Sequence, residues 1–362
     1  MADTRVVPVS SVKYGLKAET SFGVGLDSSG ADGTAYLTQP VVQVQKPTFN
    51  ILRESRLISG RGSVKNAADT VVNTRGGTVT MPFDMLATPR TLAQHMLLVG
   101  QENGQSGSIV HEMEIDGSSN NDSIGGTISS GLPHSCNLAY YPGAASEGIK
   151  MCGVVCSDLT LTGDVAANNG LLSISGNYFS GFSTKDIATS TALEVDFTVA
   201  NWAAAETTYF NVLDCDTRTL DADDRTILTF IMKSFAFNIS NGVNRIGFDT
   251  NGNAEAYAFP EYAVTGSLVI KYDNQFNYLA TNNVIQDFLD GDTLSLNIIC
   301  GDSAPNAEGE LEIDAEIQYT GDPGQDLSES GIFHTLEFEC VQNGSTEAFK
   351  ISSFKNEAVT AW

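Results

Sequence analysis

The sequence has few basic residues: 19 Lys and Arg stand against 44 Asp and Glu, for a formal net charge of −25. No Lys or Arg occurs between Lys271 and Lys350, a stretch of 78 residues that holds sixteen acidic ones. Residues 1–200 carry a net charge of −6, and residues 201–362 carry −19. Such a chain repels polyanions, so the balance excludes a protein that holds nucleic acid on a basic surface.

Long hydrophobic segments are also missing. No run of about 18 apolar residues occurs, and the N-terminal residues lack the apolar core of a signal peptide. We therefore expect no membrane span and synthesis in the cytoplasm, with the protein leaving only inside a larger particle. The six cysteines (136, 152, 156, 215, 300 and 340) have no zinc-type spacing. They are expected to be buried, reduced thiols.

Catalytic motifs are absent. Residues His95, His111, His134 and His334 show no metal-binding spacing, and no G-x-S-x-G, H-E-x-x-H or phosphate-binding glycine loop occurs. The segment 249–255 superficially resembles a calcium loop, but its glycine is misplaced and no acid follows at the twelfth position, so an ordinary turn is favoured. The sequence thus indicates no catalytic residue, no metal and no cofactor, and predicts that the chain is not an enzyme.

Short apolar and alternating segments separated by glycine-rich turns predict a mainly β protein. We expect strands at 41–51, 77–83, 136–141, 151–162, 171–179, 193–199, 208–213, 226–239, 266–272, 293–300 and 310–319, and short helices near 90–100 and 284–289. The turn Asn168-Asn-Gly170 is typical of a hairpin. Residues 102–131 and 214–224 read as loops, and 183–191 as a linker.

The two halves repeat one order of features. Gly76-Gly-Thr-Val-Thr-Met-Pro-Phe-Asp84 has an echo in Thr265-Gly-Ser-Leu-Val-Ile-Lys-Tyr-Asp273, and Phe49-Asn-Ile51 recurs as Phe237-Asn-Ile239. A helical segment closed by glycine follows in each half. The pattern predicts an internal duplication, with an arm at 1–12, a first domain at 13–190 and a second at 191–362. The alternative is that two β-rich halves look alike by composition.

One segment alternates completely. In 310–319, Leu311, Ile313, Ala315, Ile317 and Tyr319 point one way, and the acids Glu310, Glu312, Asp314 and Glu316 point the other. Glu337 and Glu339 repeat this pattern on a later strand. Carboxylates about 7 Å apart on one strand face repel each other. Two interpretations stay open: a solvated outer face, or a wall that keeps another polyanion at a distance.

The most basic segment of the chain lies between strand candidates, at residues 52–75. It carries Arg53, Arg56, Arg61, Lys65 and Arg75 against two acids. A loop of this length within a compact domain is usually functional or disordered.

In the order of these features the sequence resembles the tail tube (major tail) proteins of long-tailed bacteriophages. The resemblance covers about residues 10 to 355. Its parts are Lys13-Tyr-Gly-Leu-Lys-Ala-Glu, the Phe49-Asn-Ile strand, the Gly-Thr-Val strand before a helix, Cys156-Ser-Asp-Leu-Thr-Leu-Thr, Asn168-Asn-Gly-Leu-Leu-Ser-Ile-Ser, and in the second half Phe237-Asn-Ile-Ser-Asn-Gly, Val264-Thr-Gly-Ser-Leu-Val-Ile and Gly309-Glu-Leu-Glu-Ile.

The family implies two similar β-sandwich or half-barrel domains, each with one short helix, that assemble into a tubular β-barrel through which DNA passes without specific binding. The chain would be a virion protein of the tail, made in the host cytoplasm. Glu310, Glu312, Asp314, Glu316, Glu337 and Glu339 would line the lumen, and the basic loop at Arg53, Arg56, Arg61, Lys65 and Arg75 would join successive rings.

The resemblance also implies partners. The chain would bind itself, as trimers with pseudo-sixfold symmetry stacked into a tube, together with tape-measure, tail-tip and tail-terminator proteins. Two other classes of protein stay open. A capsid or decoration protein would share the β-richness without needing an acidic strand face, and a β-sandwich glycan-binding module would use the 249–255 loop.

Overall fold

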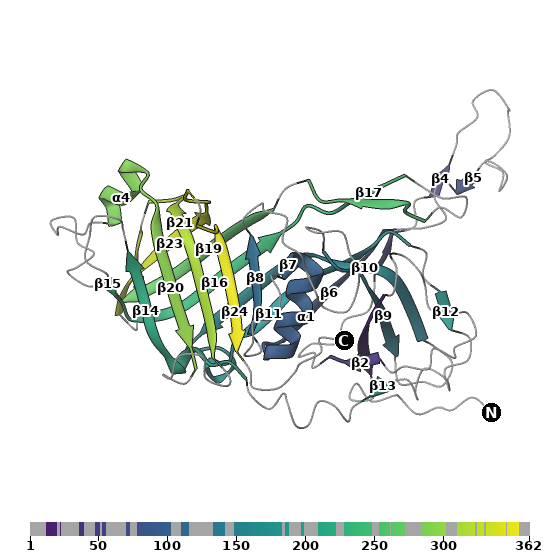
Figure 1. The fold of residues 1–362 in the computed structure, drawn as a ribbon, viewed down its shortest axis with the longest axis horizontal. Helices are drawn as coiled ribbons and strands as arrows, with labels where there is room; N and C mark the ends of the chain where they lie inside the picture. The colour runs from purple at the N-terminus through teal and green to yellow at the C-terminus, as the bar shows by residue number, and fades with distance from the viewer. Residues whose placement is uncertain are drawn as a thin grey trace.

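The computed structural model shows a mainly β protein whose described residues include two helices, α1 and α4 (Figure 1). The residues that the structure describes are 12–19, 22, 36–39, 48–50, 53–55, 70–72, 78–102, 110–115, 133–141, 148–182, 185–187, 197–198, 209–221, 228–247, 253–260, 262–271, 284–301, 310–322, 324–328, 331–344 and 346–354.

The elements of the first half, in chain order, are β1 (Lys13–Ala18), β2 (Tyr36–Thr38), β3 (Thr48–Asn50), β4 (Arg53–Ser55), β5 (Thr70–Val72), β6 (Thr78–Leu86), α1 (Pro89–Val99), β7 (Gln101–Glu102), β8 (Val110–Ile115), β9 (Cys136–Tyr141), β10 (Gly148–Asp164), the 3-10 turn η3 (Asn168–Gly170), β11 (Ser173–Ser180) and β12 (Lys185–Ile187).

Those of the second half are β13 (Phe197–Thr198), η4 (Val212–Asp214), β14 (Cys215–Asp221), β15 (Leu228–Thr229), β16 (Met232–Ser240), β17 (Asn244–Ile246), β18 (Ala256–Ala258), β19 (Ala263–Lys271), α4 (Val284–Asp290), β20 (Leu294–Cys300), β21 (Leu311–Tyr319), β22 (Gly324–Ser328), β23 (Gly331–Cys340) and β24 (Phe349–Phe354).

A single large sheet, almost entirely antiparallel, runs through both halves. Its central strands lie in the order β3, β6, β11, β10, β16, β19, β23, each antiparallel to its neighbours. The long strand β10 joins the halves, because its residues Asp158–Asp164 pair with Ser234–Ser240 of β16. The only parallel pairing among the described strands is that of β2 with β13.

The sheet branches at β10 and continues beyond β23 through β21. Strand β9 lies along the N-terminal part of β10 and pairs with β1, and β20 lies along β21 and pairs with β14. The N-terminal part of β21 also pairs with β24, which pairs in turn with β8 of the first half. Two hairpins, β4–β5 and β17–β18, form small sheets of their own.

The core follows from the two-residue period of the strands. One cross-strand row is apolar through both halves and consists of Met85, Ile174, Leu161, Phe237, Gly266, Phe338 and Tyr319. Gly266 is required in this row, since a Cβ there would lie 2.4 Å from Cε2 of Phe338. Burial of these rows and of the inner face of α1 is the main stabilising term.

Helix α1 begins and ends where the sequence indicates. The Thr88 hydroxyl accepts from the Thr91 backbone N–H at 3.2 Å, Thr91 Oγ1 accepts from the Thr88 N–H at 2.9 Å, and Pro89 occupies the first turn. At the other end the Gly100 N–H donates to the Met96 carbonyl at 2.8 Å. The helix packs on β10 of the first half and β24 of the second (Figure 1).

Most predicted elements are confirmed, among them both helices, β9, β21 and the turn at η3, where Asn168, Asn169 and Gly170 all have positive φ. Four expectations are wrong. The segment predicted as an acidic turn contains β14, the predicted strand 208–213 gives way to η4, the predicted loop 102–131 contains β8, and the predicted linker 183–191 contains β12. For the three strands, tertiary pairing overrides local composition: β14 pairs with β20, β8 pairs with β24, and β12 pairs with β10.

The expectation that all six cysteines are reduced is also wrong. Cys215 on β14 and Cys300 on β20 are direct cross-strand partners and form a disulfide. The other four form no disulfide among the described residues, and burial is the main cause that raises the pKa of Cys136 and Cys156 well above its usual value. The register of two distant strands, rather than the spacing of the cysteines in the sequence, brings the pair together.

Candidate functional site

The solvent-side face of the central sheet is polar across both halves. The row next to the apolar one consists of Asp84, Ser175, Thr160, Asn238, Thr265, Glu339 and Gln318. The next row on the same face lies two residues further along each strand and contains Leu86, Ser173, Thr162, Ala236, Ser267 and Glu337. Apart from Leu86 and Ala236, hydroxyl, amide and acidic side chains therefore cover strands of both halves in one register. We call this surface the polar face.

Side-chain hydrogen bonds join neighbouring strands on the polar face. Thr160 Oγ1 donates to Asn238 Oδ1 at 3.1 Å across the junction of the halves. The hydroxyls of Thr162 and Ser173 lie 2.8 Å apart, and Asn177 Nδ2 donates to Asp158 Oδ1 at 3.1 Å. These bonds hold the short hydroxyl and amide side chains against the sheet.

The charges on the polar face are mainly negative. Glu337 and Glu339 are exposed, and Asp84, Asp158 and Asp164 are partly exposed. Lys233 and Lys271 lie at one end, where β16 begins and β19 ends, and the Lys233 ammonium sits 4.7 Å from the Phe333 ring centroid. The two cross-strand rows described above contain no cation.

The structure separates the acids predicted from the alternating segment. Glu310 and Glu316 are buried, with 4% and 7% of their surface exposed, so a fully solvated row is wrong for these two. Ser295 donates to Glu316 at 2.5 Å, and Asn297 donates to Glu312 at 3.0 Å and to Asp314 at 2.5 Å. The alternation itself is confirmed, since the apolar residues of β21 are buried.

The acids of β21 and the acids of β23 lie in different parts of the sheet. The N-terminal part of β21 pairs with β24, whereas its C-terminal residues pair with β23, which carries Glu337 and Glu339. Burial is the main cause that raises the pKa of Asp314, the Asn297 hydrogen bond lowers it, and Glu312 raises it further. The role of Glu310, Glu312, Asp314, Glu316, Glu337 and Glu339 as a channel lining stays a prediction.

The basic loop is described only at its base. Arg53 lies in β4, which pairs with β5, while Arg56, Arg61, Lys65 and Arg75 lie outside the described residues. The β4–β5 hairpin projects beyond the sheet at the far end of the first half (Figure 1). Residues 249–252 of the rejected calcium loop (249–255) also lie outside the described residues.

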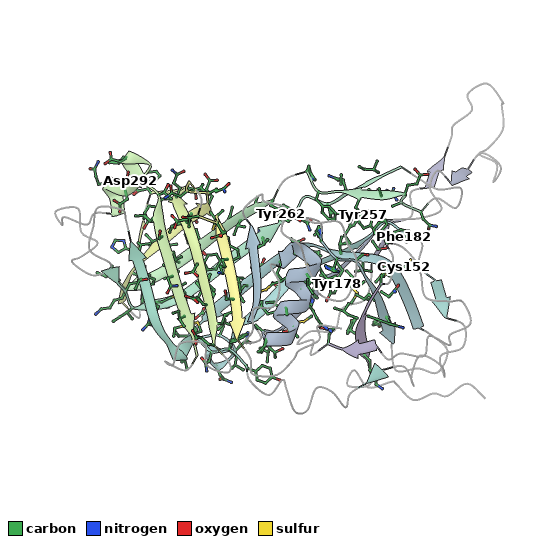
Figure 2. All side chains as sticks on the ribbon, in the orientation of Figure 1. Cys152, Tyr178, Phe182, Tyr257, Tyr262 and Asp292 are labelled. Atoms are coloured by element: carbon green, nitrogen blue, oxygen red, sulfur yellow. A yellow bond between two sulfur atoms is a disulfide. The ribbon has the colours of Figure 1, made fainter. Side chains whose placement is uncertain are left out.

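An aromatic contact that the sequence did not indicate holds the halves together. Tyr257, on the β17–β18 hairpin, donates from its hydroxyl to the Gly153 carbonyl at 2.6 Å and accepts from the Gly181 N–H at 2.7 Å (Figure 2). Its ring lies 4.7 Å from Phe22 and 5.4 Å from Phe179 between centroids. We call this contact the Tyr257 anchor. The sequence carries no local signal for this contact, because it forms only when the hairpin docks on the first half.

Within the described ranges, no three His, Cys, Asp or Glu side chains are placed to hold a metal ion. None of the described helices is long and apolar enough to cross a membrane. The cavity bordered by Tyr14, Gln39, Met81, Phe83 and Tyr178 has room for little more than a water molecule.

No protein-family model matches this chain, and no curated protein matches its sequence. The polar face, the strand edges and the two hairpins are therefore interpreted from their own geometry.

Proposed function

We propose that the chain is the tail tube subunit of a long-tailed bacteriophage, a structural virion protein. Copies would assemble into stacked rings around a channel, and the phage genome would pass through it into the host. The observation that carries this proposal is the polar face, which continues in register from one half to the other without a cation in its central rows.

The chemistry of the polar face suits a channel wall for DNA. Phosphates bind proteins through Lys and Arg, with release of counterions, so a wall without cations gives DNA no place to bind tightly. Glu337, Glu339 and Asp84 repel the phosphates, and the short hydroxyl and amide groups are bonded to one another. DNA would slide along such a wall.

The duplication that a tube of this kind needs is supported by repeated pairings. Strand β3 pairs with β6 around the β4–β5 hairpin, and β16 pairs with β19 around the β17–β18 hairpin. Next come α1 and α4, and then a long strand (β10, or β21 followed by β22) that pairs with the following strand (β11 or β23). The register of the first pair differs by two residues: Phe49 pairs with Val79, whereas Phe237 pairs with Gly266 and not with Leu268.

The junction inside one chain suggests the junction between chains. Strand β10 of the first half pairs with β16 of the second. The corresponding strands are β22 and β3, which among the described strands pair only with β23 and β6, respectively. We propose that β22 of one copy pairs with β3 of the next. This head-to-tail contact closes into a ring, and three two-domain chains would give six tube domains.

Electron microscopy of the purified protein at high concentration, with native mass spectrometry, tests this function. We expect hollow filaments or stacked rings with three chains in each ring. Because filament growth can require a nucleus, the same sample is also mixed with phage tail tips as a seed. Protein that stays monomeric beside tail tips would contradict the proposal and favour a capsid protein or a binding module.

A further inference from the structure

The exposed apolar side chains gather at the two ends of the central sheet, and none of those described belongs to the two rows of the polar face. At the end where β10 stops and β11, β16 and β23 begin lie Val165, Tyr209, Leu213, Ile231 and Ile332. At the opposite end lie Phe22, Ile246 and Leu289. Single exposed apolar residues are ordinary, but their concentration at two ends indicates contact surfaces.

The first surface lies at one end of the β10–β16 junction between the halves. Val165 directly follows β10, and Ile231 directly precedes β16, where its carbonyl accepts from the Lys271 N–H at 2.8 Å. Leu213 adjoins the turn after β10, since a Cβ on Gly170 would lie 2.7 Å from its Cγ. Ile231 and Leu213 are 60% and 61% exposed, so neither side chain is covered by its own chain. We call Val165, Leu213 and Ile231 the junction base.

The second surface lies at the other end of the same junction. There the β17–β18 hairpin leaves β16 and forms the Tyr257 anchor on the first half (Figure 1). Phe22 is 43% exposed, although its ring centroid lies 5.4 Å from that of Phe182, and Ile246 of β17 is 53% exposed. We call Phe22 and Ile246 the hairpin surface. Leu289 lies on α4 beside β21 and belongs to neither surface.

The charges beside the two surfaces are complementary. The charged side chains are Lys233, Lys271 and Asp164 at the junction base, and Glu255, Glu19 and Arg245 at the hairpin surface. The exposed one is the cation Lys271 at the first surface and the anion Glu255 at the second, whereas the others are only partly exposed. Opposite charges at two contact surfaces favour their association with each other over the association of either with itself.

The two surfaces cannot touch within one chain. They lie at opposite ends of β16, which has nine residues and is therefore about 30 Å long at 3.3 Å per residue. A second copy placed further along the same strand direction brings its hairpin surface to the junction base of the first. Because the two surfaces differ, this contact is head-to-tail and repeats along a filament.

We propose that the junction base of one copy docks on the hairpin surface of a copy in the next ring, with Lys271 facing Glu255. This inference rests on the proposed function, because it takes the stacking of rings from it and adds which surfaces meet. Burial of apolar side chains on both copies would stabilise the contact. The charges would set the direction of stacking, since two junction bases facing each other would bring their lysines together.

An acid placed on the junction base of the full-length chain tests the contact. We expect Ile231→Glu to form rings, while its critical concentration for filaments rises about tenfold, because a charge replaces an apolar side chain that stacking would bury. The matched control is Leu289→Glu, the same kind of change at a position that is 64% exposed and outside both surfaces. It should leave the critical concentration unchanged. Sedimentation over a concentration series measures the filaments, and native mass spectrometry detects single rings.

A charge exchange tests whether the two surfaces face each other. We expect Lys271→Glu to raise the critical concentration about threefold, because it would bring two acids together, and the further change Glu255→Lys to restore part of the loss. Both side chains are exposed, so the fold tolerates the changes. A double variant that polymerises no better than Lys271→Glu would contradict the pairing.

Cross-linking of filaments of the unaltered protein provides a measurement that needs no variant. A carbodiimide joins Lys to carboxylates that are in direct contact with it. Lys271 and Glu255 lie at opposite ends of one chain, so a link between them joins two copies. We expect this link in the filaments and its absence from single rings. Filaments without a link from Lys233 or Lys271 to Glu255 would contradict the inference.

The outcomes separate this contact from the proposed function. Unchanged polymerisation of Ile231→Glu would overturn the contact and leave the tube function intact. Folded Ile231→Glu that forms neither rings nor filaments would assign the junction base to the contact within a ring. If circular dichroism shows that this variant does not fold, the charge exchange and the cross-link decide. Failure of the unaltered protein to form filaments even with tail tips would contradict the proposed function and this contact with it.

Discussion

At the scale of single residues, His95 in α1 is a fully buried polar group with a partner on each ring nitrogen. Its Nδ1 lies 2.6 Å from the Thr91 carbonyl and its Nε2 lies 2.5 Å from the Tyr178 hydroxyl, all in the core. Burial lowers the pKa of His95 to about 4, against a partial opposing effect of the Thr91 hydrogen bond. The ring is neutral at pH 7, so Nδ1–H donates to Thr91 and Nε2 accepts from Tyr178.

This depressed pKa predicts sensitivity to acid. As the pH falls below 6.5, the unfolded state takes up a proton on His95 before the folded state does. The contribution of His95 to the free energy of unfolding is therefore intact above pH 6.5 and is lost toward pH 4. The loss amounts to about 3 kcal/mol at 1.36 kcal/mol per pKa unit. Urea unfolding of the native chain at pH 7 and pH 4.5 measures it.

Two variants separate titration from packing at this position. In His95→Gln the contribution of this residue to the loss between pH 7 and pH 4.5 should disappear. Tyr178→Phe removes the hydrogen-bond partner but keeps the titrating ring, so it should lower stability at both pH values and keep the acid-dependent loss. An unchanged pH dependence in His95→Gln would show that other groups cause the acid sensitivity.

At the scale of elements, the approach of β16, β19 and β23 depends on one glycine. Gly266 stands between Phe237 and Phe338, whose ring centroids are 5.6 Å apart, and a Cβ there would also lie 2.9 Å from the Ala236 carbonyl oxygen. The second contact is with backbone, which cannot rotate away. The glycine that the sequence repeats in both halves thus has a packing role in the second.

Gly266→Ala should therefore destabilise the fold by about 1–3 kcal/mol, the usual cost of overpacking a well-filled core. Gly321→Ala is the matched control, since a Cβ there would meet only Glu337 Oε2 at 3.4 Å. Thermal unfolding of both variants measures the difference. Equal melting temperatures would mean that the sheet adjusts to the extra methyl group.

The helices and most strands could be predicted because their signals are local. Pro89, the Thr88 cap and Gly100 mark the ends of α1, and alternation marks β21. Strand β14 could not be predicted, because Cys215–Asp221 is acidic and polar and becomes a strand only through its pairing with β20. The same limit applies to β8.

At the scale of the whole molecule, the location of the charged residues matters as well as the net charge. The cation-free rows of the polar face continue across β10 and β16, so the two halves present one surface. A structural protein that carries DNA through its centre needs such continuity, because one cationic patch repeated along a filament would hold the duplex.

Placing a cation on this surface should therefore slow DNA passage. In Glu337→Lys, every ring of the assembled tube would carry added cations at the wall, and we expect ejection to slow about tenfold at low salt, with recovery as salt rises. Asp290→Lys, an exposed position on α4, makes the same charge change away from the face and is the control. If both variants eject DNA at the normal rate, the polar face is not the channel wall.

The sequence by itself determined the features that depend on neighbouring residues: the mainly β class, both helices, the alternation of β21 and the separation of acidic and basic segments. Only the tertiary structure decided which strands are partners. That choice buried Glu316 against Ser295, joined Cys215 to Cys300, and set Tyr257 between Gly153 and Gly181. The reason is physical: side-chain periodicity specifies which face of a strand is buried, whereas register and pairing depend on contacts between residues far apart in the chain.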